Sequence, residues 1–176
     1  MRDEPPQRCV AVGGRQIPNP GGDIYDHFEA NYVWADGTRG FAVSRHQDRT
    51  FQEVADDILG SKGRAFARAD TRSKPLTEIH SGGEVWRYQG PWNLSYQTEH
   101  DELFASIRSG RPINDGVRMA NSTLAAIMGR VAAYTGQEIT WEMVWNSKEK
   151  LVPDNLDWNG SLPAPEVPMP GIRQYI

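Results

Sequence analysis

The chain has 176 residues, which fits about one domain of ~100–200 residues and is short for a two-domain cofactor enzyme. Its 19 Lys and Arg residues against 23 Asp and Glu residues give a net charge of -4, which offers no basis for electrostatic capture of nucleic acid or of an anionic membrane. No apolar run approaches the ~20 residues that span a bilayer, and the chain does not start like a signal peptide. We therefore expect a cytoplasmic protein, while an export signal on a longer parent chain stays open.

The first predicted strand spans residues 8–12 and stops at Gly13 and Gly14. It contains Cys9, which is the only cysteine of the sequence and which we expect to be buried in this strand. A single cysteine excludes an intrachain disulfide and a cysteine-based zinc site.

The clearest local pattern predicts a β-hairpin over residues 27–46. Apolar and polar residues alternate on both sides of an Asp-Gly pair at residues 36–37, which is typical of a two-residue turn. The expected pairs are Tyr32 with Phe41, Ala30 with Val43, Glu29 with Ser44 and His27 with His46. One face would then be apolar and covered, and it would consist of Phe28, Ala30, Tyr32, Phe41 and Val43. The other face would be polar or small, which suits solvent, a ligand or another subunit.

Further strands are predicted before the pattern changes. They cover Ile58–Leu59, Arg64–Ala69 and Glu84–Tyr88, and residues 60–63 form the turn between the first two. Together these segments predict an antiparallel meander of roughly five to seven strands.

The second half of the chain shows helical periodicity. A first helix would start with a capping box of Thr98 and Asp101 and would end at Gly110. A longer helix begins near Asn114 and closes at Gly136, and its many small residues permit close packing. Strands followed by helices predict an α+β fold, in which helices cover one face of a mostly antiparallel open sheet.

Residues 151–176 are expected to form an extended, Pro-rich C-terminal tail. Five of the 12 prolines fall in the last 24 residues, which disfavours a helix. The apolar residues of the tail favour a strap that packs on the domain or on a partner subunit over a free end. They are Trp158, Val167, Met169, Ile172 and Tyr175. We therefore divide the chain into an α+β domain of residues 1–150 and this tail.

Several residues are candidates for ligand contacts. His27 and His46 can bind a polyol hydroxyl or transfer a proton, and a solvent-exposed or interfacial pair is the alternative. Arg15 and Gln16 follow the first strand on a loop, where ligand contacts concentrate, although a loop arginine is usually solvated. His100 either lines a site or belongs to the solvated, acidic first turn of a helix.

Metal and nucleotide motifs are missing from the sequence. The four histidines are widely spaced, without the short separations of metal ligands. No glycine-rich strand-to-helix loop occurs. The sequence therefore predicts neither a metal site nor a nucleotide site in this chain.

A series of segments in a specific order and spacing covers nearly the whole chain. These segments are Gly13–Gln16, Asp23–Phe28, Ile58–Arg64, Tyr96–Phe104, Ile107–Gly116, Ala133–Gly136 and Met169–Gly171. Taken together, they resemble the C-terminal part of the Gfo/Idh/MocA oxidoreductases, in the branch often found in planctomycetes and related bacteria.

The resemblance implies a division of labour in a longer parent protein. In that family an N-terminal Rossmann domain binds NAD(P), and a C-terminal α+β domain supplies a substrate wall and an oligomer surface. The enzymes oxidise or reduce sugars, inositols and related polyols. The resemblance therefore implies NAD or NADP in the parent, no cofactor in this chain alone, a missing Rossmann domain and a homo-oligomer formed through the sheet face. The catalytic motif of the family would precede this sequence, so no catalytic residue is assigned.

The first hypothesis is a substrate-binding and oligomerisation domain of an NAD(P)-dependent sugar or polyol oxidoreductase, inactive without its nucleotide-binding half. The expected substrate-facing residues are Arg15, Gln16, Tyr25, His27 and His100. A stand-alone, non-catalytic sugar-binding or assembly module is the second hypothesis. Part of an NAD-dependent glycosidase is the third. A truncated gene product, a mis-called start and an excised domain all remain open as the origin of the chain.

Overall fold

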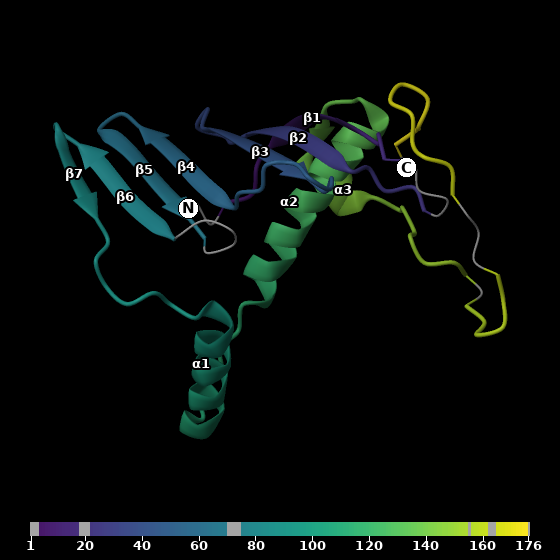
Figure 1. Ribbon diagram of the computed structural model, residues 1–176. Coiled ribbons are helices and arrows are strands. Elements are labelled where there is room, and N and C mark those ends of the chain that lie inside the picture. Colours follow the sequence, from purple (N-terminus) through teal and green to yellow (C-terminus); the bar gives the residue numbers. More distant parts are fainter. Residues whose placement is uncertain (1–3, 18–21, 70–74, 155, 162–164, 176) are drawn as a thin grey trace. The chain divides into compact units, whose positions relative to one another are not determined.

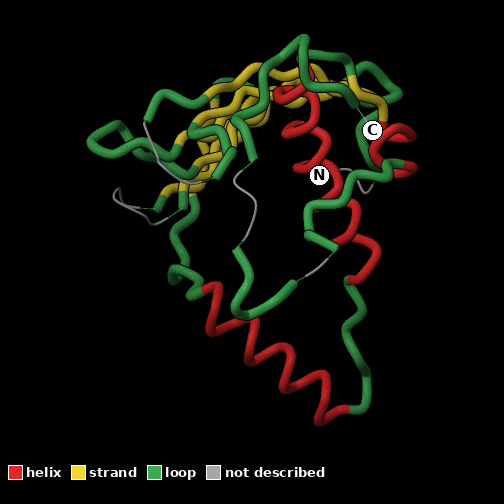
Figure 2. The backbone as a smooth tube through the Cα atoms, turned by 90° about the vertical axis from the view of Figure 1, so that its right-hand side faces the viewer, coloured by secondary structure: helices red, strands yellow, loops and turns green. Residues whose placement is uncertain are grey.

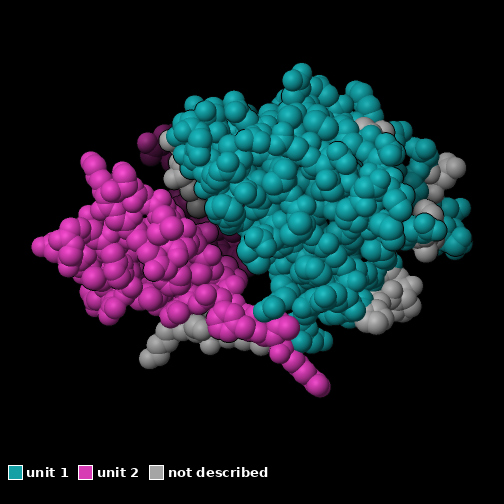
Figure 3. Space-filling view, turned by 90° about the horizontal axis from the view of Figure 1, so that it is seen from above, with its two compact units in different colours: residues 1–48, 115–176 teal, residues 49–114 magenta. Residues whose placement is uncertain are grey.

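The computed structural model describes residues 4–17, 22–69, 75–154, 156–161 and 165–175. Within this part, eight strands and three helices belong to two compact units, which Figure 3 colours separately. Unit 1 comprises residues 1–48 and 115–176, and unit 2 comprises residues 49–114. Each unit contains one antiparallel four-stranded sheet. The predicted α+β class is confirmed, with two sheets in place of a single one.

The sheet of unit 1 has the strand order β3-β2-β1-β8. Its strands are β1 (Arg8–Gly14), β2 (His27–Val33), β3 (Arg39–Arg45) and β8 (Ile139–Thr140). Helix α2 (Gly116–Thr135) packs on β1 and β2, and the short α3 (Trp141–Asn146) packs on α2 and β8 (Figures 1 and 2). As predicted, α2 ends at Gly136, which adopts the left-handed conformation that favours glycine.

The core of unit 1 lies between this sheet and the C-terminal half of α2. It consists of Cys9, Ala30, Met128, Val131, Ala132, Ile139 and Val144. The small residues of α2 allow the close approach that the sequence predicts, since a Cβ atom on Gly129 would overlap the Tyr32 hydroxyl. The Tyr32 hydroxyl donates a hydrogen bond to the Ala125 carbonyl at 3.0 Å, which fixes α2 over β2.

Cys9 is fully buried in β1, as the sequence predicts. Burial raises the pKa of its thiol to about 11, because the thiolate would lose its hydration. The thiolate is the reactive form, so at pH 8 we expect Cys9 to resist a disulfide reagent in the folded protein and to react fully once denaturant unfolds it. Rapid labelling without denaturant would contradict this burial.

The β2–β3 hairpin forms, but its register differs by one residue from the predicted one. His27 pairs with Arg45 and Tyr32 pairs with Gly40, so the predicted His27–His46 and Tyr32–Phe41 pairs are wrong. The turn is longer than expected. The Gly37 amide donates to the Trp34 carbonyl at 3.0 Å, and Gly37 has a φ of 84°, so three residues form the loop and glycine takes its left-handed position.

The shifted register exchanges the two faces of β3, because side chains alternate along a strand. Ala42 and Ser44 lie on the same side as α2, whereas Phe41 and Val43 lie on the opposite side. The predicted apolar face that joins Phe41 and Val43 to Tyr32 is therefore wrong. In the described part of the chain, the face away from α2 is exposed and mixes charged side chains, such as Glu29, Arg39 and Arg45, with large apolar ones. The exposed large apolar residues on this face are Val10, Val12, Phe41 and Val43, with 44%, 66%, 67% and 77% of their surface accessible.

Unit 2 contains a meander of four strands and one helix. These are β4 (Ala55–Gly60), β5 (Gly63–Arg68), β6 (Leu76–Ser81), β7 (Glu84–Arg87) and α1 (Ser95–Ser109). The predicted strands and the helix end at Gly110 are confirmed, and β6 is an additional strand. The capping box is wrong, because α1 starts after Leu94 and the Thr98 hydroxyl donates to Asn93 Oδ1 at 2.5 Å.

The C-terminal tail forms hydrogen bonds with the rest of unit 1. The Tyr25 hydroxyl donates to the Pro168 carbonyl at 2.7 Å, and the Gly171 amide donates to the Thr135 carbonyl at 2.9 Å. The Tyr175 hydroxyl donates to the carbonyl of a residue in α3. The tail is thus held close to the C-terminal end of α2 and to α3.

Candidate functional site

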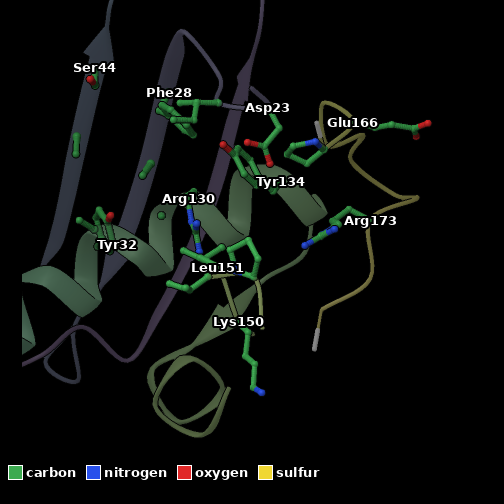
Figure 4. A pocket seen from close by; sticks show the side chains of 18 of the residues that line it. Asp23, Phe28, Tyr32, Ser44, Arg130, Tyr134, Lys150, Leu151, Glu166 and Arg173 are labelled. Atoms are coloured by element: carbon green, nitrogen blue, oxygen red, sulfur yellow. The ribbon is translucent and has the colours of Figure 1, made fainter. Parts of the chain in front are cut away.

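A large cavity lies in unit 1, on the side of the sheet where α2 packs (Figure 4). Its volume is about 1130 Å³. The walls come from β2, β3 and α2, from the segment before β2, and from the chain that follows α3. We call it the α2-side cavity.

Asp23, Arg130, Tyr134 and Arg173 lie near one another at one end of this cavity, as Figure 4 shows. Glu166 also belongs to the lining, but its side chain points away from this group. The Arg130 guanidinium lies over the Tyr134 ring, with Cζ 5.8 Å from the ring centroid, in the range of a cation–π contact. Burial raises the pKa of Tyr134, so its hydroxyl stays protonated and available as a donor at neutral pH.

Glu149 joins α2 to the tail at the wall of the cavity. Arg130 Nη2 donates to Glu149 Oε2 at 2.6 Å, and Arg173 Nη2 donates to Glu149 Oε1 at 3.3 Å. Arg130 Nε is buried and has no hydrogen-bond partner in the described part of the chain. One carboxylate therefore pairs with two guanidinium groups, and its bond to Arg130 helps to fix the position of that side chain.

The remaining walls of the cavity are mostly apolar. Phe28 and Ala30 of β2 contribute one part, and Leu151 and Val152 after α3 contribute another. The register described above gives β3 only small residues here, Ala42 and Ser44, which leaves space in front of the strand. A concave, mostly apolar surface with a few convergent polar groups is the usual form of a small-molecule site.

A second polar group of residues surrounds Asp26, directly before β2. Asp26 Oδ2 accepts hydrogen bonds from the Gln16 and Ile17 amides, each at 2.7 Å. Asp26 Oδ1 accepts from His27 Nδ1 at 2.7 Å and from Gln47 Nε2 at 3.0 Å. A carboxylate only accepts, so the His27 proton resides on Nδ1 and Nε2 of the neutral ring is left as an acceptor.

The Asp26 cluster predicts a pH dependence of stability. The hydrogen bond from His27 and those from the loop amides lower the pKa of Asp26 far below its usual value. A depressed folded-state pKa stabilises the protein above the unfolded value of about 3.9, and this contribution is lost as the pH falls through and below that value. We expect Asp26→Asn to lower the denaturant midpoint at pH 7.

The same variant should also lose less stability than the parent chain between pH 7 and acid pH. Asp57 and Glu78 also have lowered pKa values, but they contribute equally to both proteins. Identical pH profiles of the two proteins would contradict a folding role for the Asp26 carboxylate.

Three of the residues predicted to face substrate come together at this cluster. Gln16 and His27 meet at Asp26, and Arg15 braces the same loop. Arg15 Nη1 donates to the Gly22 carbonyl at 2.5 Å. His27 lies on the face of the sheet away from α2, because it alternates with Phe28, which lines the cavity.

The other two predicted residues lie elsewhere. Tyr25 is only 4% exposed and packs against Tyr134, with its hydroxyl bonded to the tail. His100 is exposed on α1 in unit 2, where its Nδ1 lies 2.7 Å from the Tyr96 carbonyl oxygen. Thus none of the five predicted residues lines the α2-side cavity.

Sequence reasoning did not identify the polar residues of the cavity. Arg130 offers the one available signal, since it is a single charge in a stretch of small and apolar residues between Leu124 and Tyr134. A cation on the packed side of such a helix needs a partner. The partner, Glu149, follows α3 and gives no sign of this role in the sequence.

In the described part of the chain, no helix is long and apolar enough to span a membrane. Among the same residues, no group of three or more His, Cys, Asp or Glu side chains is arranged to hold a metal ion. Within the described residues, no strand runs through a glycine-rich turn into a helix.

Among the comparisons with known proteins, the one with solved structures gave matches. No family model and no curated protein matches the sequence. Among solved structures, the aldose–aldose oxidoreductase from Caulobacter crescentus complexed with glycerol matches with a TM-score of 0.62 and 19% identity, over 78% of this chain and 42% of its own. UDP-N-acetylglucosamine 3-dehydrogenase GnnA from Acidithiobacillus ferrooxidans matches with a TM-score of 0.61 and 18% identity, over 73% and 41%.

The WlbA dehydrogenase from Bordetella pertussis, in complex with NADH and UDP-GlcNAcA, matches with a TM-score of 0.55 and 17% identity, over 77% of this chain and 39% of its own. The chain thus spans about two-fifths of the length of these structures. At such identities the likeness shows a shared fold. The neighbours are Gfo/Idh/MocA-type oxidoreductases, and this chain has the fold of one part of such an oxidoreductase.

Proposed function

We propose that the chain is the substrate-binding and subunit-contact part of an NAD(P)-dependent oxidoreductase that acts on sugars or polyols. The main support is the structural match, which covers 73–78% of this chain but only 39–42% of oxidoreductases whose names include aldose and sugar-nucleotide enzymes. NAD(P) accepts or donates a hydride in such reactions and would be bound by another part of the protein. The residues of this chain hold and orient the substrate.

The α2-side cavity is the proposed substrate site. Asp23 offers acceptors, and Arg130 and the Tyr134 hydroxyl offer donors, which matches the mixed hydrogen-bonding capacity of a hydroxyl group. His27 and Gln16 are a further proposed contact at the Asp26 cluster, with His27 Nε2 as an acceptor for a hydroxyl. Arg15 and Tyr25 support these groups by bracing the loop and the tail.

The exposed face of the unit 1 sheet, away from α2, is the proposed subunit contact, because four large apolar side chains lie on it among polar ones. Monomeric proteins rarely leave several large apolar side chains together on one open sheet face. We expect the chain to form homo-oligomers through this face, and Phe41→Glu to shift it toward monomer in light scattering. Gln137→Glu, at an exposed position beyond α2, is the control and should leave the assembly unchanged. Equal masses for all three proteins would contradict this contact.

Calorimetry on the purified chain tests the proposed function. Sugars or polyols such as glucose, glycerol and myo-inositol should bind, whereas NAD and NADP should not. A longer chain read from the coding sequence upstream should then reduce NAD or NADP with one of these sugars. Tight NAD(P) binding by this chain would overturn the division of labour. Sugar binding without hydride transfer by any longer chain would favour a stand-alone sugar-binding module.

A further inference from the structure

We infer that the α2-side cavity binds a neutral sugar that carries an apolar substituent, as an alkyl or aryl glycoside does. This inference rests on the proposed function, because it names the class of sugar that the same site takes. Three observations carry it: the balance of charge at the polar end, the apolar character of the other walls, and the size of the cavity.

The charges at the polar end are already compensated within the chain. Glu149 bonds to both Arg130 and Arg173, and Lys150 Nζ lies 3.3 Å from Asp154 Oδ1. Glu149 and Asp154, which lie outside the lining, thus pair with the three cations of the lining, and Asp23 adds a carboxylate within it. Three cations and three carboxylates balance, so a carboxylate or phosphate on the ligand would meet no net positive charge, whereas neutral hydroxyl groups can both donate and accept.

The other walls are mostly apolar. Phe28, Ala30 and Ala42 lie on the strand side, and Leu151 and Val152 lie on the side after α3. The strand side also contains the Ser44 hydroxyl and the Tyr32 hydroxyl, and the latter already donates to the Ala125 carbonyl. The Leu151 and Val152 side chains are exposed, at 67% and 64%, although they border the cavity. An apolar group of the ligand would cover them, and each buried CH₂ contributes about 0.8 kcal/mol in the transfer scale.

The size of the cavity requires more than one sugar ring. Sites for drug-sized ligands usually measure about 300–1,000 Å³, and this cavity, at about 1130 Å³, exceeds that range. A single hexose would leave the apolar end filled with water. A sugar ring beside Arg130 and Tyr134, with its apolar group in front of Ala42, would fill both ends of the cavity.

Matched glycosides test this inference on the chain as it stands. Methyl and phenyl β-D-glycosides of glucose, galactose and mannose would be titrated by calorimetry, together with phenyl β-D-glucuronide. For the preferred sugar, the phenyl glycoside should bind at least tenfold more tightly than the methyl glycoside. The glucuronide should bind at least tenfold more weakly than phenyl glucoside.

A variant on β3 and a control on β4 test the apolar end. Ala42→Trp should fill the apolar end, reduce phenyl glycoside affinity to the methyl value and leave methyl glycoside affinity unchanged. Leu59→Trp, at an exposed position of β4 outside the cavity and the proposed subunit contact, should change neither affinity. Equal binding of methyl and phenyl glycosides, or the same loss in both variants, would overturn the inference while sugar binding itself survives. A chain that binds none of the glycosides would contradict the proposed function as well.

Discussion

Gly13→Ala is expected to destabilise unit 1 by about 2 kcal/mol, within the range of ~1–3 kcal/mol for overpacked sites. A Cβ at this position would lie 2.7 Å from the His27 carbonyl oxygen and 3.0 Å from the Tyr25 ring. It would also lie 3.3 Å from the Phe28 ring, so the strand has no free direction in which to relax. In thermal unfolding the loss should lower Tm by about 4–8 °C.

Gly14→Ala is the matched control, because it adds the same methyl group one residue further on and on the other face of β1. Its nearest neighbour would be His27 Cε1, at 3.2 Å, and that ring lies on the open side of the sheet. We expect a loss well under 1 kcal/mol. Equal losses in the two variants would show that the Tyr25 and Phe28 rings do not pack over Gly13 as described.

Glu149→Ala is expected to destabilise the protein by about 1–3 kcal/mol and to release the tail. Breaking a buried ion pair costs about 3–5 kcal/mol. Here the side chains of Arg130 and Glu149 are 25% and 22% exposed to solvent, which reduces the loss. The loss remains substantial because Arg130 Nε has no partner in the described part of the chain. Chemical denaturation measures the stability, and limited proteolysis after α3 measures the release.

Asp154→Ala removes a carboxylate of the same charge from an exposed ion pair and serves as the control for Glu149. Lys150 and Asp154 are 76% and 81% exposed, so this pair contributes at most about 1 kcal/mol. Weaker glycoside binding in the Glu149 variant alone would also support its role in positioning Arg130. Equal stability and equal proteolysis rates in the two variants would contradict the role of Glu149 in holding Arg130 and the tail.

Local patterns predicted most of the fold and failed where two patterns compete. Alternation located β2 and β3, and helical spacing located α2 with its end at Gly136. The predicted turn between β2 and β3 was too short by one residue, because Asp36-Gly37 suits both a two-residue turn and the end of a three-residue loop. The choice depends on which side chains of β3 face α2, and that is a tertiary property.

The candidate site was harder to predict, since its residues are brought together from distant segments. Asp23 precedes β2, Arg130 lies on α2, and Glu149 and Arg173 belong to the chain after α3. Only the loop at Arg15 and Gln16 and its neighbour His27 follow a local rule, because they flank strand ends. Sequence reasoning therefore found the Asp26 cluster and not the cavity.

The three-residue loop between β2 and β3 determines two surfaces of this protein at once, because it sets the register of β3 against β2. A two-residue turn at the same place, with Ala35 added to the strand, would slide β3 by one position. Phe41 and Val43 would then enter the cavity, and Ala42 and Ser44 would replace them on the open face. A one-residue slip at a solvent-exposed turn would thus narrow the ligand site and remove the large apolar side chains from the open face together.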